Sequence, residues 1–320
     1  MRGLYLMKQR ELERLRVVQM VLDGKITQRY ASSLLGLSYR QTKRVVRRIK
    51  EEGVSGVIHK SRGKSSKRKI SDSLRSLVLS LYRDIYPDFS VTLFREKLEY
   101  VHDIHLSRET IRKVLIDGNL RKSRKKNKRR VHIFRKRKDS FGELIQIDGS
   151  THRWLEERMD GKLTLMGYID DATGNTFARF YDYEGVSPFL DSFIRFAKIY
   201  GLPKSIYVDR HSTYKTTREP TIEEQLENRK PKTQVERILG NLGVNIIHAY
   251  SPQAKGRVER LFKTLQDRLI KEMRLKGIRT KEDANCFLEE YLPVFNKQFA
   301  KTPKSNISVF RKPSKDFDYE

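Results

Sequence analysis

The sequence predicts a multidomain protein in which all-α N-terminal units precede an α/β domain with a mixed sheet flanked by helices. Apolar residues recur at helical spacing through roughly the first 120 positions, and strand-like runs replace this spacing from about residue 141. The charge changes at the same place: residues 1–140 carry 38 basic and 14 acidic side chains, and residues 141–320 carry 30 and 26. The positive excess, +28 over the whole chain, therefore lies mostly in residues 1–140 and predicts a polyanionic partner for this N-terminal part, most simply nucleic acid.

Length, cysteine content and hydropathy limit the classes of protein to which the chain can belong. The 320 residues have room for about two or three domains. A single cysteine, Cys286, excludes an intramolecular disulfide and any zinc cluster built on cysteine, and its apolar helical context predicts a buried thiol. No run approaches the roughly 20 apolar residues of a membrane-spanning helix, and the start of the chain, Met1–Lys8, is too short for a signal peptide. We therefore expect a cytoplasmic protein without a membrane segment.

Residues 1–58 have the pattern of a DNA-binding helix-turn-helix domain. Thr27 is placed to cap one helix, and Ser38 with Gln41 is spaced as a capping box for the next, over residues 39–50. Two helices joined by a short glycine turn, the second of them basic, favour insertion of the second helix into the major groove. A solvated basic helix in a small bundle is the alternative. The basic side chains expected at DNA are Arg40, Lys43, Arg44, Arg47 and Arg48.

Residues 71–120 repeat this pattern more loosely, beyond a flexible linker over residues 59–70. Ser90 and Ser107 are each placed to cap a helix. The prediction is a second helix-turn-helix-like domain. A purely structural helical bundle is the alternative, because the outer face is less basic than in the first domain. The expected DNA contacts are Arg108, Arg112 and Lys113.

A basic linker follows over residues 121–139. Positions 121–138 hold twelve Lys and Arg residues and no acid, so the stretch repels itself and is best explained as a tether that follows phosphates. A nuclear-localisation signal is the alternative interpretation. The side chains assigned to DNA here are Lys125, Lys126, Arg129 and Arg130.

Strand signals begin at residues 144–147, an apolar run that ends at Asp148. Two further strands, over residues 162–170 and 176–181, complete an antiparallel meander. After a helix, a second apolar strand over residues 205–208 ends at Asp209. The other expected elements are helices at 186–200, 233–242, 254–276 and 281–299, a strand at 244–249, and a polar insertion at 215–232.

Three acidic residues are the strongest candidates for a catalytic role, two at strand ends and one on a helix face. Asp148 and Asp209 each end an apolar strand, at the rim of a sheet where α/β folds place their sites. Glu259 lies beside the inward stripe of the helix that starts near residue 254. Simpler roles are expected elsewhere: turns for Asp160, Asp170, Asp171 and Asp182, core packing for Trp154, and for His211 either an ordinary loop or a contact to a ligated Asp.

Three motifs carry a resemblance to a known family: Ile147-Asp148-Gly149, Val208-Asp209-Arg210-His211 and Pro252-Gln253-Ala254-Lys255-Gly256-Arg257-Val258-Glu259-Arg260. With the meander before them, they make residues 140–300 similar to the ribonuclease-H-like catalytic core of DDE transposases and retroviral-type integrases. The closest resemblance is to transposases of bacterial insertion sequences, in the ISNCY group. Glu259 follows Asp209 by 50 positions, more than in the integrase pattern. The insertion at 215–232 explains the excess if it loops out; otherwise Glu236 is a weaker candidate.

The resemblance implies a site of three carboxylates and a divalent metal. Asp148, Asp209 and Glu259 would ligate two Mg²⁺ ions, for which Mn²⁺ can substitute, with Asp148 bridging the two. The helix that carries Glu259 also has a basic face, which is expected to hold DNA or, alternatively, to be only a solvated surface. Its residues are Lys255, Arg257, Arg260 and Lys263.

The resemblance further implies a DNA transposase that binds double-stranded DNA at the terminal inverted repeats of its element, cleaves a strand at each end and joins it to target DNA. A homo-oligomer on DNA is expected because two ends are cut together, in the bacterial cytoplasm at the nucleoid. Residues 301–320 are expected to be a linker toward a C-terminal domain that this sequence lacks. Two rival interpretations are open: a non-catalytic repressor derived from a transposase, and a nuclease of ribonuclease-H type acting on RNA–DNA hybrids.

Overall fold

The computed structural model describes residues 7–62, 69–123, 136–216, 218–226, 230–249 and 256–312. These residues form two compact units, Met1–Arg75 and Ser76–Glu320. Each unit is described by itself. Within the described residues, no helix is long and apolar enough to cross a membrane.

The first unit is a three-helix domain with a helix-turn-helix. Its elements are α1 (Gln9–Leu22), α2 (Gln28–Leu35), α3 (Tyr39–Glu52) and a 3-10 helix (Gly53–Val57). The predicted caps are confirmed: the Thr27 hydroxyl accepts from the Tyr30 amide at 3.2 Å, and Ser38 and Gln41 form a reciprocal capping box. The buried core joins α1 to α3 and consists of Val18, Val45, Val46, Ile49 and Val57.

A second helical group comprises α4 (Asp72–Asp84), α5 (Val91–His102) and α6 (Arg108–Asp117). Ser90 accepts from the Leu93 amide and Ser107 from the Thr110 amide, so both predicted caps are confirmed. The helices bury Val78, Tyr82, Leu93, Phe94, Leu98, Ile111, Val114 and Leu115.

The rest of the second unit is built on a five-stranded mixed sheet, as predicted. The strands are β1 (Ile145–His152), β2 (Leu163–Asp170), β3 (Thr176–Tyr181), β4 (Ser205–Val208) and β5 (Asn245–His248). Their order is β3-β2-β1-β4-β5. The first three pair antiparallel as the expected meander, whereas β4 and β5 run parallel to β1.

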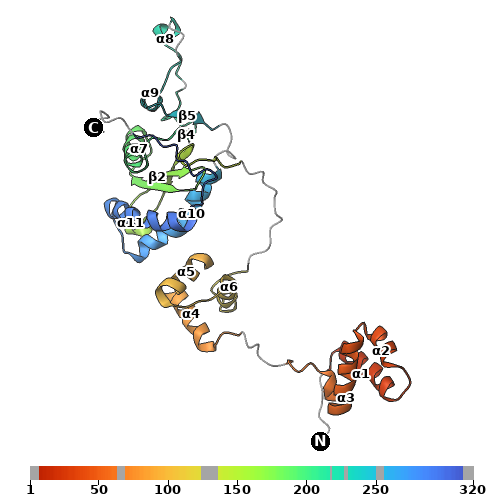
Figure 1. Cartoon of the computed structure of the whole chain (residues 1–320). Coiled ribbons are helices and arrows are strands. Elements are labelled where there is room, and N and C mark those ends of the chain that lie inside the picture. Colours follow the sequence, from red (N-terminus) through yellow and green to blue (C-terminus); the bar gives the residue numbers. More distant parts are fainter. Residues whose placement is uncertain are drawn as a thin grey trace. The chain divides into compact units, whose positions relative to one another are not determined.

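Helices cover both faces of this sheet (Figure 1). On one face, α7 (Val186–Tyr200) and α9 (Gln234–Asn241) share a core cluster with alternate residues of β1 and β2, such as Ile147 and Tyr168. On the other, α10 (Gly256–Leu275) and α11 (Lys281–Phe299) pack on residues such as Leu165 and Phe180. Strand order, strand direction and the two helical layers give the ribonuclease-H-like arrangement that the sequence predicts.

The polar insertion before α9 carries one short helix, α8 (Ile222–Leu226), and extends away from the sheet (Figure 1). None of the residues of α8 is buried. The insertion therefore lengthens the chain between β4 and α10 without adding to the core.

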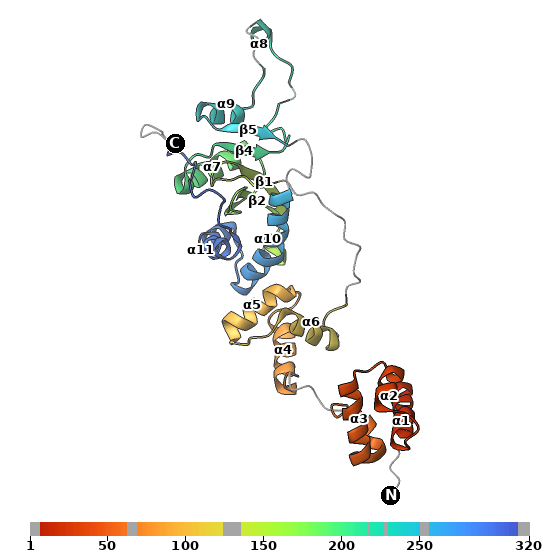
Figure 2. The ribbon, with the colours of Figure 1, turned by 45° about the vertical axis from the view of Figure 1, so that its right-hand side comes forward.

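The second helical group packs on the far end of α10 (Figure 2). Glu96 of α5 and Arg268 of α10 form a buried ion pair with two hydrogen bonds of 2.6 and 2.7 Å. Beside them Lys97 pairs with Glu272 at 2.6 Å. These contacts join the second helical group to the sheet domain in one compact unit, whereas the sequence predicts a separate domain over residues 71–120.

Two sequence predictions about the outer parts of this unit are wrong. The described part of the expected linker, residues 301–312, packs along the core: Leu202 and Arg311 form a backbone bridge, and the Phe310 ring lies 4.9 Å from that of Phe141. The apolar Phe310 side chain explains this, because it covers the end of the α7 cluster. Cys286 is exposed on α11 because its neighbours Ala284, Asn285 and Leu288 make the inner face instead.

Candidate active site and nucleic-acid interface

The first two predicted acids lie at the same level on neighbouring strands. In the parallel pair of β1 and β4, Ile145 lies opposite Ile206 and Gln146 opposite Tyr207, an offset of 61 positions. The same offset relates Asp148 to Asp209, which follows the last residue of β4. Because residues at the same level of adjacent strands point to the same face, the two carboxylates belong to one surface of the sheet. Both residues are half-buried.

The first turn of α10 lies over that surface. The Val258 amide donates to the Gln146 side-chain oxygen at 3.3 Å, and Gln146 shares its face of β1 with Asp148. Gly167 is the strand partner of Asp148, and a Cβ at Gly167 would lie 2.8 Å from the Phe262 ring. The sheet therefore admits α10 only because residue 167 has no side chain. Glu259 belongs to this first turn and is exposed.

The three acids suit a hard metal ion by their chemistry. Carboxylate oxygens are the ligands that Mg²⁺ and Mn²⁺ prefer in proteins. Across the described ranges, however, no three His, Cys, Asp or Glu residues are grouped closely enough to hold an ion. Residues 250–255, which precede α10, lie outside the described part of the chain.

The alternative third acid, Glu236, has a structural role. It is the third residue of α9, and its carboxylate accepts from the Thr233 amide at 2.8 Å in a capping box. Its other oxygen lies 3.2 Å from His248 Nε2. His211 contacts Asp209 through its backbone, whose N–H donates to Asp209 Oδ1 at 3.0 Å. Its ring lies 3.0 Å from the Thr213 hydroxyl, as expected for a loop histidine.

Asp171 is not the simple turn residue that the sequence predicts. It is fully buried, and its Oδ1 accepts from Arg257 at 2.7 Å and from Gln146 at 2.9 Å. Its Oδ2 accepts from the Lys138 amide at 2.8 Å. Arg257, expected at DNA, thus links α10 to the sheet. The turn role predicted for Asp171 is wrong, because a charge this deep in the protein requires a cationic partner, which Arg257 provides. The DNA contact of Arg257 stays a prediction.

Asp170, its neighbour, does cap the turn as predicted. Its Oδ2 accepts from both the amide and the hydroxyl of Thr173 at 2.7 Å. Burial raises the pKa of the Asp170 carboxyl, although these hydrogen bonds act in the opposite direction. Trp154 is also confirmed as a core residue: it is fully buried and donates to the Ser150 carbonyl at 2.9 Å.

Two residues beside the acids were not singled out in the sequence. The carboxylate of Glu184, between β3 and α7, lies against Gly149, the residue after Asp148. The side chain of Tyr214, which follows the end of β4 by six residues, is buried. Neither is marked by a motif: Tyr214 follows Asp209 by five positions, and Glu184 has no signal in the sequence.

The basic face of α3 is exposed. Arg40, Lys43, Arg44 and Arg47 are all open to solvent, and Arg48 is half-buried. The Lys43 ammonium lies 5.4 Å from the centre of the Tyr39 ring, and Arg47 is 3.6 Å from Glu51. These contacts are weak at an exposed surface, so the side chains can exchange them for phosphates or base edges.

The other predicted DNA contacts differ in how far they remain available. Arg112 on α6 makes two hydrogen bonds to Glu109, at 2.8 and 2.7 Å, which offset its charge. Arg108 and Lys113 on α6, and Arg260 and Lys263 on α10, are exposed. Several predicted contacts lie outside the described residues: Lys125, Lys126, Arg129, Arg130 and Lys255.

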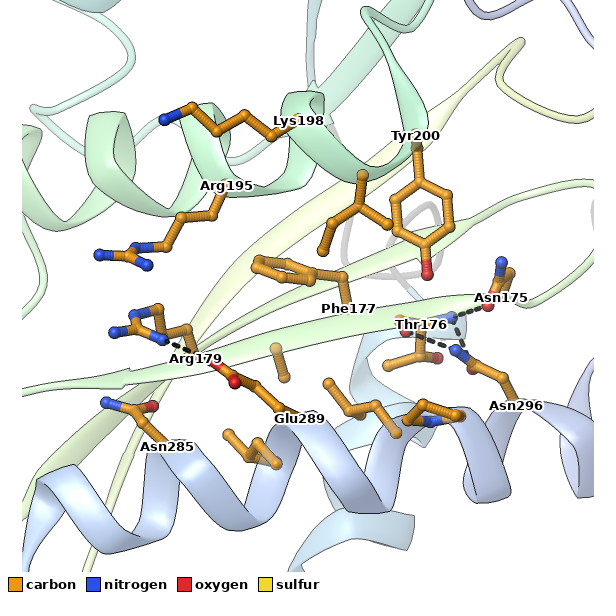
Figure 3. A pocket seen from close by; sticks show the side chains of 15 residues that line it. Asn175, Thr176, Phe177, Arg179, Arg195, Lys198, Tyr200, Asn285, Glu289 and Asn296 are labelled. Carbon is orange, nitrogen blue, oxygen red and sulfur yellow. Dashed lines mark hydrogen bonds and ion pairs between the residues drawn. The ribbon is translucent and has the colours of Figure 1, made fainter. Parts of the chain in front are cut away.

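A pocket of about 650 Å³ lies between β3, α7 and α11 (Figure 3). Asn296 spans its floor by bonding both the amide and the carbonyl of Thr176 at 2.8 Å. Its lining is largely apolar and includes none of Asp148, Asp209 and Glu259. The pocket is therefore separate from the candidate chemistry.

Two family models match the N-terminal part of the chain. A helix-turn-helix domain matches residues 13–65, which contain α2 and α3. A homeodomain-like domain matches residues 41–115. Both descriptions agree with the helical caps and the exposed basic face reported above.

Two curated proteins match nearly the whole chain. The protein y4bF of Sinorhizobium fredii (strain NBRC 101917 / NGR234), which is named as a transposase, is 39% identical over 310 residues, 97% of this chain and 66% of that protein. The transposase for insertion sequence IS1202 of Streptococcus pneumoniae is 31% identical over 337 residues, 94% of this chain and 70% of that protein. The chain thus spans about two thirds of the length of each relative.

Among solved structures, the catalytic core domain of HTLV-2 integrase in complex with magnesium is 14% identical, with a TM-score of 0.34 over 47% of this chain and 84% of that one. The catalytic core domain of BIV integrase is 19% identical, with a TM-score of 0.34 over 50% of this chain and 88% of that one. A simian T-cell lymphotropic virus intasome in complex with the PP2A regulatory subunit B56 gamma has a TM-score of 0.40 and 16% sequence identity, over 67% of this chain and 73% of that one.

Proposed function

Since the chain belongs to the transposases of insertion sequences, we propose that it binds the terminal inverted repeats of its element and catalyses metal-dependent strand cleavage and strand transfer. Cleavage would expose a 3′-hydroxyl at each end, and the same site would direct this hydroxyl at target DNA. We place the activity in the bacterial cytoplasm, at the nucleoid, and the element in the ISNCY group.

The observation that carries the proposal is the pairing of Asp148 with Asp209. They share one level and one face of the sheet, and the first turn of α10, with Glu259, lies over that face. Asp148 and Asp209 come from strand ends 61 positions apart in the sequence and face the same surface, which favours a shared site over two unrelated turn caps.

We assign Asp148, Asp209 and Glu259 as ligands of two Mg²⁺ ions, with Mn²⁺ as a substitute. Bound there, the ions would make a water or a 3′-hydroxyl nucleophilic and stabilise the leaving oxygen. The chain's own contribution is to hold the carboxylates on rigid elements. Arg257 and Asp171 fix the start of α10 against β1, and Phe262 fixes it against β2.

Basic side chains would bring double-stranded DNA to these acids. We propose that α3 reads the repeat in the major groove and that α6 makes a second contact through Arg108 and Lys113. Arg260 and Lys263 follow Glu259 on α10 and would hold the phosphates next to the cleaved bond. Because two ends react together, we propose a homo-oligomer on DNA.

The test is cleavage of a labelled duplex that carries the element's own terminal repeat, with Mg²⁺, Mn²⁺ or EDTA. Asp148→Asn, Asp209→Asn and Glu259→Gln should each abolish nicking while repeat binding remains. Asp160→Asn, at an exposed acid in another loop, is the matched control and should nick normally. Full nicking by all three acid variants would contradict the proposal, and salt-sensitive binding without nicking in any metal would favour a repressor.

A further inference from the structure

The strand β3 is an edge strand of the sheet, and two asparagines of α11 bond its outer side in place of a further strand. Asn296 bonds both the amide and the carbonyl of Thr176 at 2.8 Å, and Asn285 bonds those of Phe180 at 2.8 and 3.1 Å. A carboxamide suits such an edge, because it presents a donor and an acceptor in one plane.

Ala178 lies midway between these two contacts and lacks a third asparagine. In an antiparallel pair, alternate residues of a strand direct their N–H and C=O to the same side, so Ala178 faces outward like Thr176 and Phe180. Within the described residues, its outward N–H and C=O have no hydrogen-bond partner, although Ala178 is only 4% exposed. Buried backbone groups are nearly always bonded, so this position suits a further carboxamide.

Ala178 lines the pocket of about 650 Å³ between β3, α7 and α11, which we call the β3 groove. Apolar side chains make up much of its lining, among them Leu292 and Ile199, the second of which is 63% exposed. The lining also holds three cations and a single acid. Two of the cations, Arg195 and Lys198, lie on α7 across the groove from α11 (Figure 3). The groove therefore matches a ligand that combines apolar groups, a carboxamide and negative charge.

The short helix α8 carries these three features on its surface. Ile222, Gln225 and Leu226 are spaced to lie on one face of the helix, and Ile222 and Leu226 are 77% and 82% exposed. Described residues 218–226 hold three glutamates and one arginine, so the segment is acidic. Burial of this apolar face against a partner would be favourable, because it removes both side chains from water.

The shape of α8 is fixed by its own polar contacts, since none of its residues is buried. The Thr221 amide donates to the Glu224 carboxylate at 2.9 Å, and Arg218 makes two hydrogen bonds to the same carboxylate at 2.7 and 2.9 Å. A helix that is formed before binding loses less conformational entropy when it docks.

We propose that the β3 groove binds α8 of a second copy of this chain. Ile222 and Leu226 enter the apolar part of the groove, and Glu223, which is exposed on the same helix, faces the cations of α7. The Gln225 carboxamide bonds the outward N–H and C=O of Ala178, as the asparagines of α11 bond the residues on either side. This interface rests on the homo-oligomer of the proposed function and identifies one of its contacts.

The first measurement is sedimentation velocity of the full-length protein at several concentrations, without DNA or metal. Ile222→Ser/Leu226→Ser should raise the Kd of self-association at least about 10-fold, because two apolar side chains lose their burial. Gln225→Leu should raise this Kd about 5-fold, because the Ala178 backbone loses its partner. Tyr100→Ser, at an 80% exposed residue of α5, is the matched control and should retain the wild-type Kd. All these variants should keep the wild-type Tm, because they change exposed side chains.

A charge exchange tests whether the two surfaces meet. Lys198→Glu should weaken self-association, because it places a negative charge opposite Glu223. Lys198→Glu/Glu223→Lys should recover most of the loss, since each copy then again presents opposite charges to the other. A double variant that associates no better than Lys198→Glu would overturn the proposed interface.

Cross-linking identifies which molecules are joined. With Cys286 replaced by Ser, which removes the exposed native thiol, a short bismaleimide should join Ile199→Cys protein to Leu226→Cys protein when the two are mixed. Neither protein alone should form this product. If Ile199→Cys/Leu226→Cys instead cross-links within single molecules, at a dilution where the protein is monomeric, α8 occupies its own groove and the proposed interface is wrong.

A wild-type protein that stays monomeric, an unchanged Kd in Ile222→Ser/Leu226→Ser, or no cross-link in the mixture would each overturn the proposed interface. Asp148→Asn separates this interface from the proposed function, because the variant should assemble like the wild type and fail to nick. If Asp148→Asn assembles and nicks, the candidate active site is wrong and the interface stands. If it fails to nick while the α8 variants assemble normally, only the interface fails.

Discussion

At the scale of single residues, Asp171 holds together the elements around the candidate site. It accepts from Arg257 of α10, from Gln146 of β1 and from the backbone ahead of β1, and it does so without exposure to solvent. Gln146 in turn accepts from Val258. The acid therefore has its effect on the site through geometry, because it fixes where α10 begins relative to Asp148.

Arg257→Ala tests this role. Leaving a buried carboxylate without its cation usually costs about 3–5 kcal/mol, and we expect the lower end because Gln146 and the Lys138 amide remain as donors. Thermal or urea unfolding measures the loss. Lys263→Ala, at an exposed position on the same helix, should change stability by less than about 0.5 kcal/mol. An unchanged Tm for Arg257→Ala with weakened DNA binding would instead support the original expectation of a DNA contact.

The residues around the site differ in how readily the sequence predicts them. Asp148 and Asp209 are predictable because each ends an unbroken apolar run, which is a local signal. Asp171 and Asp170 share one turn sequence, and only tertiary packing decides that the second caps the turn and the first is buried against α10. Glu184 has no local signal, because its contact with Gly149, the residue after Asp148, arises from the packing of separate segments.

At the scale of elements, the residues at which helices begin were predictable from the sequence, whereas the elements that pair or pack with one another were not. Thr27, Ser38, Ser90 and Ser107 all cap the helices expected of them, because capping depends on residues within one turn. The pairing of β1 with β4 could not be predicted in this way. It joins residues 61 positions apart, and nothing in either strand specifies the other. The docking of α5 on α10 was missed for the same reason, since Glu96 and Arg268 resemble ordinary surface charges in sequence.

The pair of Glu96 and Arg268 gives a test at this scale. Both side chains are about nine-tenths buried, and Arg268 also lies 4.8 Å from the centre of the Phe299 ring. Glu96→Leu or Arg268→Met alone should destabilise the protein by about 3–5 kcal/mol, because each leaves an unpaired buried charge. The double variant should recover most of that loss, since apolar residues can replace both charges together.

Unfolding of the two single variants and the double variant in urea measures this coupling. Additive losses in the double variant would show that the two charges act separately and that the docking of α5 depends on other contacts. The pair Arg195 and Asp191, at 2.9 Å on the exposed side of α7, serves as the comparison. Its disruption should cost no more than about 1 kcal/mol, because surface ion pairs are screened by water.

At the scale of the whole molecule, the division of charge predicted from the sequence corresponds to a division of structure. The positive excess lies in the first helical domain and in the two basic stretches at residues 59–70 and 121–139, and the sheet domain that carries the acids is nearly neutral. An active site made of carboxylates repels DNA, so a separate basic surface is needed to bring the polyanion to it. The exposed side chains of α3 are the best-described part of that surface.

The dependence of DNA binding on salt tests whether α3 provides it. If Lys43 and Arg44 each neutralise a phosphate, Lys43→Ala and Arg44→Ala should each reduce the slope of log K against log salt by about 0.9, and the double variant by about 1.8. Fluorescence anisotropy of a labelled terminal-repeat duplex at several salt concentrations measures the slope. Arg16→Ala, at an exposed residue of α1 outside the helix-turn-helix pair, is the control and should leave it unchanged. A side chain that reads a base edge would behave differently: its loss would relax the preference for the repeat over other DNA, so the same titrations on an unrelated duplex distinguish the two kinds of contact.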